Sequence, residues 1–142
     1  MSTIRFAQSE KEIEQCWEAV YCLRPHLQQE QYVQQVKEMQ QEGYQLLYIT
    51  DQETGRVAAI AGFRNMYMLA GGKIIYIDDL STLPEYRGKG YGGQLLDYIH
   101  QLARKTGKAA VHLDSGYVRN DAHRLYLNKG YKLAAYHFSL IL

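Results

Sequence analysis

The chain has 142 residues, a formal net charge of +1 at pH 7 and an apolar fraction of 46%. This length suits one domain with a substantial core, so we expect residues 1–142 to form a single domain. The balanced charge argues against a disordered tail or a nucleic-acid-binding surface, and no stretch approaches the roughly 18 apolar residues of a membrane-spanning helix. Since the N-terminus also lacks the apolar segment of a secretion signal, we expect a cytoplasmic protein without nucleic-acid or membrane partners.

The first third of the chain predicts one strand and two helices. Residues 2–7 are expected to form the strand. Ser9 and Glu12 match a capping box, which indicates the start of a helix that runs on until Pro25. Apolar residues at helical spacing then predict a second helix over about 28–42.

Three strands are predicted in the middle of the chain. They cover residues 44–50, 56–69 and 73–83, and the segments between them, 51–55 and 70–72, have the composition of short turns. Short turns between consecutive strands imply an antiparallel meander.

The remaining sequence alternates helix and strand. We expect a helix over 91–106, a strand over 109–115, a short helix over 121–129, and one or two strands in 131–142. The complete order is β-α-α-β-β-β-α-β-α-β(-β). It predicts an α/β (α+β) fold with a mixed, mostly antiparallel central sheet flanked by helices.

A glycine-rich segment, YRGKGYGG at residues 86–93, lies at the junction between a strand and a helix. The first N–H groups of a helix have no partner within the helix, and that end of the helix dipole is positive. Glycines without Cβ atoms let a phosphate approach those N–H groups closely. The segment therefore predicts a phosphate- or pyrophosphate-binding site.

One pattern in this segment suggests a dinucleotide-binding protein. Gly88, Gly90 and Gly93 satisfy G-x-G-x-x-G, and Asp114 follows at the end of the next strand. The context argues against this interpretation, because the motif lies late in the chain and follows an antiparallel meander. The P-loop pattern G-x-x-x-x-G-K-[ST] is absent.

A second pattern, R-x-x-G-x-G, begins at Arg87. With its surroundings, DLSTLPEYRGKGYGGQLL, it resembles the acyl-CoA loop of the GNAT superfamily of N-acetyltransferases. The segment AHRLYLNKGY resembles the second conserved element of that superfamily, in which a tyrosine is followed four residues later by glycine and an aromatic residue. The matching residues of the two elements are Arg87, Gly90, Gly92, Tyr126, Gly130 and Tyr131.

The resemblance implies acetyl-CoA as co-substrate, without a metal. Main-chain N–H groups of the turn would bind the diphosphate; Arg87 and Lys89 would either add positive charge or lie on a solvated loop face. The pantetheine arm would pair with the end of the preceding strand, which the family usually interrupts with a bulge. Arg119 occupies the position, seven residues before the tyrosine, at which the family often carries an asparagine that contacts the cofactor. The asparagine of this chain, Asn120, comes one residue later. The implied cofactor-binding residues are Leu80, Ser81, Thr82, Arg87, Gly88, Lys89, Gly90, Tyr91, Gly92, Gly93, Arg119 and Asn120.

The resemblance also implies two catalytic residues. Tyr126 would give a proton to the departing thiolate of CoA. Asp79 occupies a position at which many relatives carry an acidic residue that orders a water or contacts the amine. A carboxylate is a poor direct base for an ammonium group, so relay through water, binding of the cation and hydrogen bonding to a neighbouring loop all remain open for Asp79.

We therefore predict an N-acetyltransferase in which a primary amine attacks the thioester directly. The acceptor is a small-molecule or peptide amine that the motifs do not identify, and we expect a monomer or a homodimer. Two alternatives remain: a non-catalytic acyl-CoA-binding or sensing module on the same fold, and a dinucleotide-dependent oxidoreductase. Four glutamates near the N-terminus either attract a cationic acceptor or form a solvated helix face: Glu10, Glu12, Glu14 and Glu18.

Overall fold

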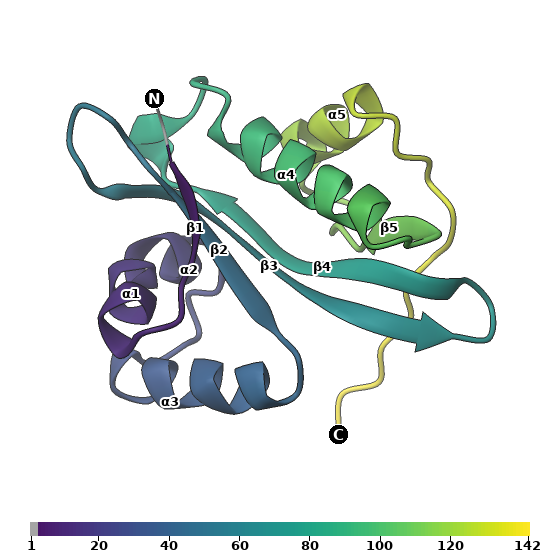
Figure 1. Cartoon of the computed structure of the whole chain (residues 1–142), viewed down its shortest axis with the longest axis horizontal. Coiled ribbons are helices and arrows are strands. Elements are labelled where there is room, and N and C mark those ends of the chain that lie inside the picture. The colour runs from purple at the N-terminus through teal and green to yellow at the C-terminus, as the bar shows by residue number, and fades with distance from the viewer. Residues whose placement is uncertain (1–2) are drawn as a thin grey trace. The chain divides into compact units, whose positions relative to one another are not determined.

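The computed structural model describes residues 3–142, and the chain divides into two compact units, one up to His112 and one of Leu113–Leu142 (Figure 1). In chain order the elements of the first unit are β1 (Ile4–Phe6), α1 (Glu10–Gln15), α2 (Trp17–Leu23), α3 (Gln29–Gln41), β2 (Gln45–Thr50), β3 (Val57–Met68), β4 (Gly72–Thr82), the 3₁₀ helix η1 (Pro84–Tyr86) and α4 (Tyr91–Lys105). Strand β5 (Ala110–Leu113) ends where the second unit begins, and α5 (Asn120–Asn128) follows.

The strands form one sheet in the order β1-β2-β3-β4-β5. Strands β1 to β4 pair antiparallel in succession, β1 with β2, β2 with β3 and β3 with β4, which confirms the predicted meander. The mixed sheet, mostly antiparallel and flanked by helices, also confirms the predicted fold class.

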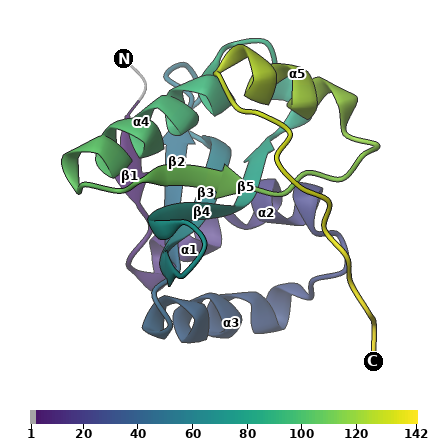
Figure 2. The same cartoon turned by 90° about the vertical axis from the view of Figure 1, so that its right-hand side faces the viewer.

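Helices cover both faces of the sheet in the first unit. Figures 1 and 2 show α1, α2 and α3 on one face and α4 on the other. Because β3 lies between these layers, residues 57–63 are all buried. Helix α4 buries one apolar face, and each fully buried leucine or isoleucine side chain contributes on the order of 1.5–3 kcal/mol through burial. The buried apolar residues of that face are Leu95, Leu96, Ile99 and Ala103.

The predicted capping box starts α1 as expected. The Ser9 hydroxyl accepts a hydrogen bond from the Glu12 N–H at 3.1 Å, and Glu12 Oε1 accepts one from the Ser9 N–H at 3.0 Å. The helix after it is not continuous, however, and the prediction of a single helix up to Pro25 is wrong. At Cys16 the backbone N–H bonds to Ile13 O, three residues back, and this tighter turn separates α1 from α2.

The predicted final strand is not formed. Residues 131–142 have no regular secondary structure, and their large apolar side chains are exposed. The apolar pattern there is typical of a strand, but a strand forms only when a neighbouring edge pairs with its backbone, which a local pattern does not supply. The exposed residues are Leu133, Tyr136, Phe138, Leu140, Ile141 and Leu142.

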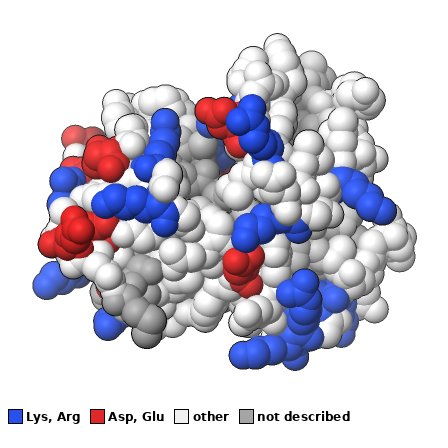
Figure 3. Space-filling model, turned by 90° about the horizontal axis from the view of Figure 1, so that it is seen from above, with Lys and Arg blue, Asp and Glu red and all other residues white. Residues whose placement is uncertain are grey.

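Charge is mixed on the face shown in Figure 3, where basic and acidic side chains are interspersed with uncharged surface. None of the helices within residues 3–142 is long and apolar enough to cross a membrane.

Candidate active site

The glycine turn has the backbone that the anion-site prediction requires. Gly88 and Gly90 have backbone φ angles of +82° and +83°, which residues other than glycine adopt only at an energetic cost. A Cβ added at either position would meet nothing within 4 Å, so the space above the turn is open.

Helix α4 begins at the end of this turn without a side-chain cap. Gly90 is the N-cap residue, and the first helical hydrogen bond runs from the Gln94 N–H to Gly90 O at 3.0 Å. The N–H groups of residues 91–93 therefore precede the hydrogen-bond ladder of the helix, at its positive end. The uncapped helix start and the open glycine turn form a backbone cradle that fits a phosphate or diphosphate.

The side chains of the turn point in different directions. Arg87 is exposed and donates through Nε to Thr82 O at 3.3 Å, which brings the turn against the end of β4. Lys89 Nζ lies 3.3 Å from Asp51 Oδ1 and 5.5 Å from the centre of the Tyr86 ring. Tyr91 is buried and donates its hydroxyl to the same Asp51 oxygen at 2.6 Å. Lys89 and Tyr91 thus direct their side chains to a buried carboxylate, and Tyr91 offers the cradle only its backbone.

Asp51 was not anticipated as a site residue. Its position at the start of the DQETG turn indicated only a turn, and the structure confirms one, since Asp51 Oδ2 accepts from the Thr54 N–H at 3.0 Å. The side chain is 2% exposed. The hydrogen bond from Tyr91, with those from Thr54 and Lys89, lowers the pKa of Asp51 to about 2.

Strand β4 contains a bulge opposite β3. Gly62 is paired with Asp79 and Phe63 with Ile77, so Asp78 has no partner residue in β3. A bulge of this kind bends its strand and redirects the side chains beside it. The extra residue, Asp78, lies two positions before Leu80, the first of the predicted pantetheine-binding residues Leu80, Ser81 and Thr82.

The edge of β4 that faces away from β3 is only partly covered by β5. Ala109, just before β5, donates its N–H to Lys73 O near the start of β4 at 2.8 Å. Strand β5 has four residues, which span roughly 13 Å, whereas residues 73 and 80 are roughly 23 Å apart along an extended strand. The edge at residues 80–82 therefore lies beyond the reach of β5.

Both carboxylates at the bulge are paired with arginines. Asp78 accepts bidentate hydrogen bonds from Arg64, the shortest at 2.7 Å. Asp79 Oδ1 accepts from Arg24 Nε at 3.0 Å and Oδ2 from the Tyr44 hydroxyl at 2.7 Å. Arg24 also donates to Asp78 O at 2.9 Å. Both oxygens of Asp79 are thus engaged, and Arg24, at the end of α2, is held against the bulge.

The second unit carries the other predicted site residues, Arg119, Asn120 and Tyr126. Arg119 is the N-cap residue of α5, and Asn120 is its first residue. The Tyr126 ring packs edge-on against Tyr131 with 5.9 Å between centroids. Burial raises the pKa of Tyr126 above its ordinary value, although Arg119 opposes the shift. The phenol therefore stays protonated at neutral pH.

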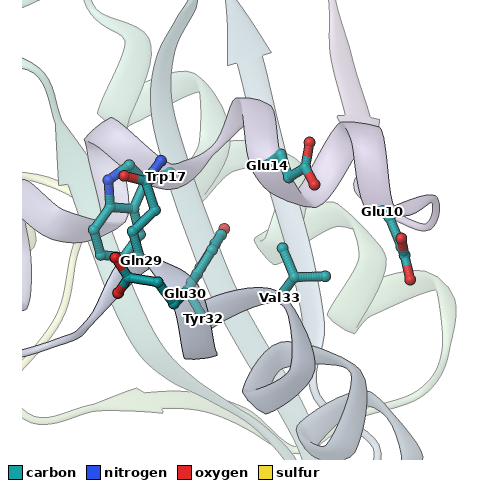
Figure 4. Close-up of a pocket in the computed structure, with 7 residues that line it drawn as sticks. All are labelled: Glu10, Glu14, Trp17, Gln29, Glu30, Tyr32 and Val33. Atoms are coloured by element: carbon teal, nitrogen blue, oxygen red, sulfur yellow. The ribbon is translucent and has the colours of Figure 1, made fainter.

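A cavity of about 360 Å³ lies between α1, α2 and α3. Figure 4 shows glutamates of α1 and α3 among the lining residues, with Trp17 at one end. Most glutamates of the N-terminal region have partners, however: Glu10 with Lys37, Glu12 with Ser9 and Tyr48, and Glu18 with Arg56. These contacts favour the interpretation of the glutamates as a solvated helix face over a role in attracting a cationic acceptor. The cavity is lined by Glu10, Glu14, Trp17, Gln29, Glu30, Tyr32 and Val33.

Comparison with known proteins identifies the family. Residues 10–131 match the model of the acetyltransferase (GNAT) family. The chain belongs to the GNAT family. It is an acetyltransferase, as the two sequence elements suggested, and the dinucleotide-binding interpretation of the glycine motif is not supported.

Individual GNAT relatives agree with this assignment. The chain is 38% identical, over 82% of each chain, to an uncharacterized N-acetyltransferase of Bacillus subtilis (strain 168), YhdJ. It is 40% identical to the aminoalkylphosphonate N-acetyltransferase of Salmonella typhimurium over 44% of this chain and 41% of that protein. The fold matches the aminoglycoside N-acetyltransferase AAC(6')-Iy in complex with CoA, with a TM-score of 0.85, 13% identity, and coverage of 100% of this chain and 95% of that one.

Within residues 3–142 no group of three or more His, Cys, Asp or Glu side chains is placed to hold a metal ion.

Proposed function

We propose that this GNAT protein transfers the acetyl group of acetyl-CoA to a primary amine of a small-molecule acceptor, by direct attack of the amine on the thioester. The observation that supports this most strongly is the uncapped start of α4 behind Gly88 and Gly90, both at positive φ with open space above them. This cradle suits the diphosphate of a CoA thioester.

In this proposal the main-chain N–H groups of residues 88–93 bind the diphosphate. Arg87 adds positive charge from its exposed position, whereas Lys89 and Tyr91 contribute backbone groups because their side chains bond to Asp51. The pantetheine arm lies along the edge of β4 at Leu80, Ser81 and Thr82. The resemblance to the family supports cofactor contacts from Arg119 and Asn120 as well.

The chemistry requires a proton for the thiolate that leaves when the amine attacks. Tyr126 supplies it in our proposal, and its raised pKa keeps the hydroxyl protonated until transfer; the proton that the attacking nitrogen loses passes to solvent water. Asp79 does not act as a direct base, because both of its oxygens already accept hydrogen bonds from Arg24 and Tyr44. It orients the bulged end of β4, and its charge favours a cationic acceptor nearby.

We propose a small amine as the acceptor because one relative is named for aminoalkylphosphonates. The similarity to that relative covers less than half of this chain, so the proposal extends to small amines as a class and not to that substrate. We further propose that the protein acts in the cytoplasm as a monomer or homodimer. Size-exclusion chromatography with light scattering measures its molar mass in solution and so tests the proposed assembly.

An acceptor screen tests the function. Purified protein is incubated with acetyl-CoA and a panel of amines that includes aminoalkylphosphonates, amino acids, aminoglycosides and peptides, and free thiol is followed with a chromogenic disulfide. We expect thiol release that depends on one class of amine. Calorimetry with CoA supplies an independent check, and a protein that binds no CoA would contradict the proposal.

A further inference from the structure

A buried carboxylate lies directly behind the turn that we assign to the diphosphate of acetyl-CoA. We propose that Asp51 is a positioning residue, which holds the glycine turn in its binding conformation and thereby sets the affinity for the donor. This inference rests on the proposed function of the turn.

The contacts of Asp51 join two segments that are far apart in the sequence. On one side, Oδ1 accepts from Tyr91 at 2.6 Å and from Lys89 at 3.3 Å, so the carboxylate bonds to residues on both sides of Gly90. On the other side, Oδ2 accepts from the Thr54 N–H and hydroxyl at 3.0 and 3.1 Å. The turn between β2 and β3 thus anchors the start of α4.

The network extends to the residue before the turn. The Thr54 hydroxyl lies 2.9 Å from the Tyr86 hydroxyl, and Tyr86 is 5% exposed. Asp51 is itself fixed by its backbone, because its N–H donates to Arg56 O and its C=O accepts from the Gly55 N–H, both at 2.8 Å. The turn between β2 and β3 therefore holds the glycine segment on both sides of Gly88 and Gly90, through Tyr86 and Tyr91.

The glycine turn needs such support. Glycine loses more backbone freedom on ordering than any other residue, and Gly88 and Gly90 have no side chains that could hold the turn through contacts of their own. A turn left free to sample other conformations would bind the diphosphate only from the fraction with the correct shape, which weakens the apparent affinity.

The positioning role and simple electrostatics predict opposite results. Asp51 places a negative charge near a site for a negatively charged ligand, and it forms an ion pair with the ammonium group of Lys89. If charge alone mattered, removing it would free Lys89 and strengthen the binding of CoA. If Asp51 holds the turn, removing its charge weakens the binding of CoA.

Calorimetric titration with CoA separates these outcomes. For Asp51→Asn, we expect the dissociation constant to rise about tenfold, as the loss of a charge-assisted hydrogen bond would produce. The matched control is Glu53→Gln, which removes a carboxylate from the exposed part of the same turn and should leave the dissociation constant unchanged. Unchanged or tighter binding by Asp51→Asn would overturn the inference.

A second variant keeps the test decisive if Asp51→Asn fails to fold. Tyr91→Phe removes only the hydroxyl that bonds to Asp51, and we expect it to raise the dissociation constant about threefold or more. Tyr98→Phe, on the same helix with its side chain partly exposed, is the control. CoA affinity of Tyr91→Phe equal to that of the wild type would also overturn the inference.

A donor without the diphosphate separates positioning from general loss of structure. With acetyl-pantetheine, we expect kcat/KM of Asp51→Asn to stay within about twofold of wild type, because the turn contributes nothing to this donor. An equal loss with both donors would overturn the inference. Failure of the proposed function is distinguishable, since the wild-type protein itself would then not bind CoA.

Discussion

The hydroxyl of Tyr44 occupies the space that Gly62 leaves by having no side chain. A Cβ built on Gly62 would lie 1.7 Å from Tyr44 Oη and 2.4 Å from its Cζ. Across this gap Tyr44 reaches Asp79, the residue paired with Gly62 in the sheet. The glycine in β3 and the tyrosine before β2 therefore fix the carboxylate at the bulge of β4.

Gly62→Ala should consequently destabilise the protein. The new methyl group cannot be accommodated without moving the buried Tyr44 ring, and we expect a loss of about 1–3 kcal/mol in the free energy of unfolding. Urea denaturation measures it. Gly71→Ala is the control, because a Cβ there would meet only Ile74 Cγ2 at an ordinary 3.6 Å. Equal midpoints for the two variants would contradict the steric argument.

The sequence predicted the meander, α4 and the glycine turn because each depends on local signals: alternation, helical periodicity and glycines that adopt positive φ. It did not predict the side chains that support them. Asp51, Arg24 and Tyr44 meet their partners only through pairing between strands and helices 35 to 55 residues apart along the chain. For the same reason the apolar pattern of residues 131–142 predicts a strand that the structure does not form, because strand formation needs an available edge.

Neutralising Asp79 tests whether it positions β4 or accepts a proton. In Asp79→Asn the amide oxygen still accepts one of the two hydrogen bonds, so we expect kcat to fall less than about tenfold, whereas removal of a general base typically costs about 10²–10⁴-fold. Initial rates with the acceptor found by the screen provide the measurement. Asp78→Asn is the matched control on the same strand. A loss above about 100-fold confined to Asp79→Asn, with disappearance of the acidic limb of the pH profile, would assign Asp79 as the base.

The capping box predicts a pH dependence of stability. Hydrogen bonds from the backbone N–H groups of Ser9 and Gln8 lower the pKa of Glu12 from 4.5 to about 2. Because the pKa in the folded state is the lower one, this stabilisation is present in full above pH 4.5 and is lost as the pH falls through about 2.

Glu12→Gln removes the titration and keeps an acceptor oxygen. We expect its urea midpoint to fall less than that of wild type between pH 5 and pH 2. Glu14→Gln, on the same helix, should retain the wild-type dependence. The same pH dependence in wild type and Glu12→Gln would show that the capping carboxylate does not contribute.

Tyr126→Phe tests the proposed proton donor. The variant retains the ring and its edge-on contact with Tyr131 but has no proton to give, so we expect kcat to fall by about 10²-fold while the dissociation constant for CoA stays within about twofold. In wild type, the raised pKa of Tyr126 keeps the donor protonated, so activity should decline only at a pH above 10, and the variant should lack this decline. Tyr117→Phe, at an exposed tyrosine of the same unit, should match wild type in both respects. Full activity of Tyr126→Phe would leave the thiolate to be protonated by solvent or by another group.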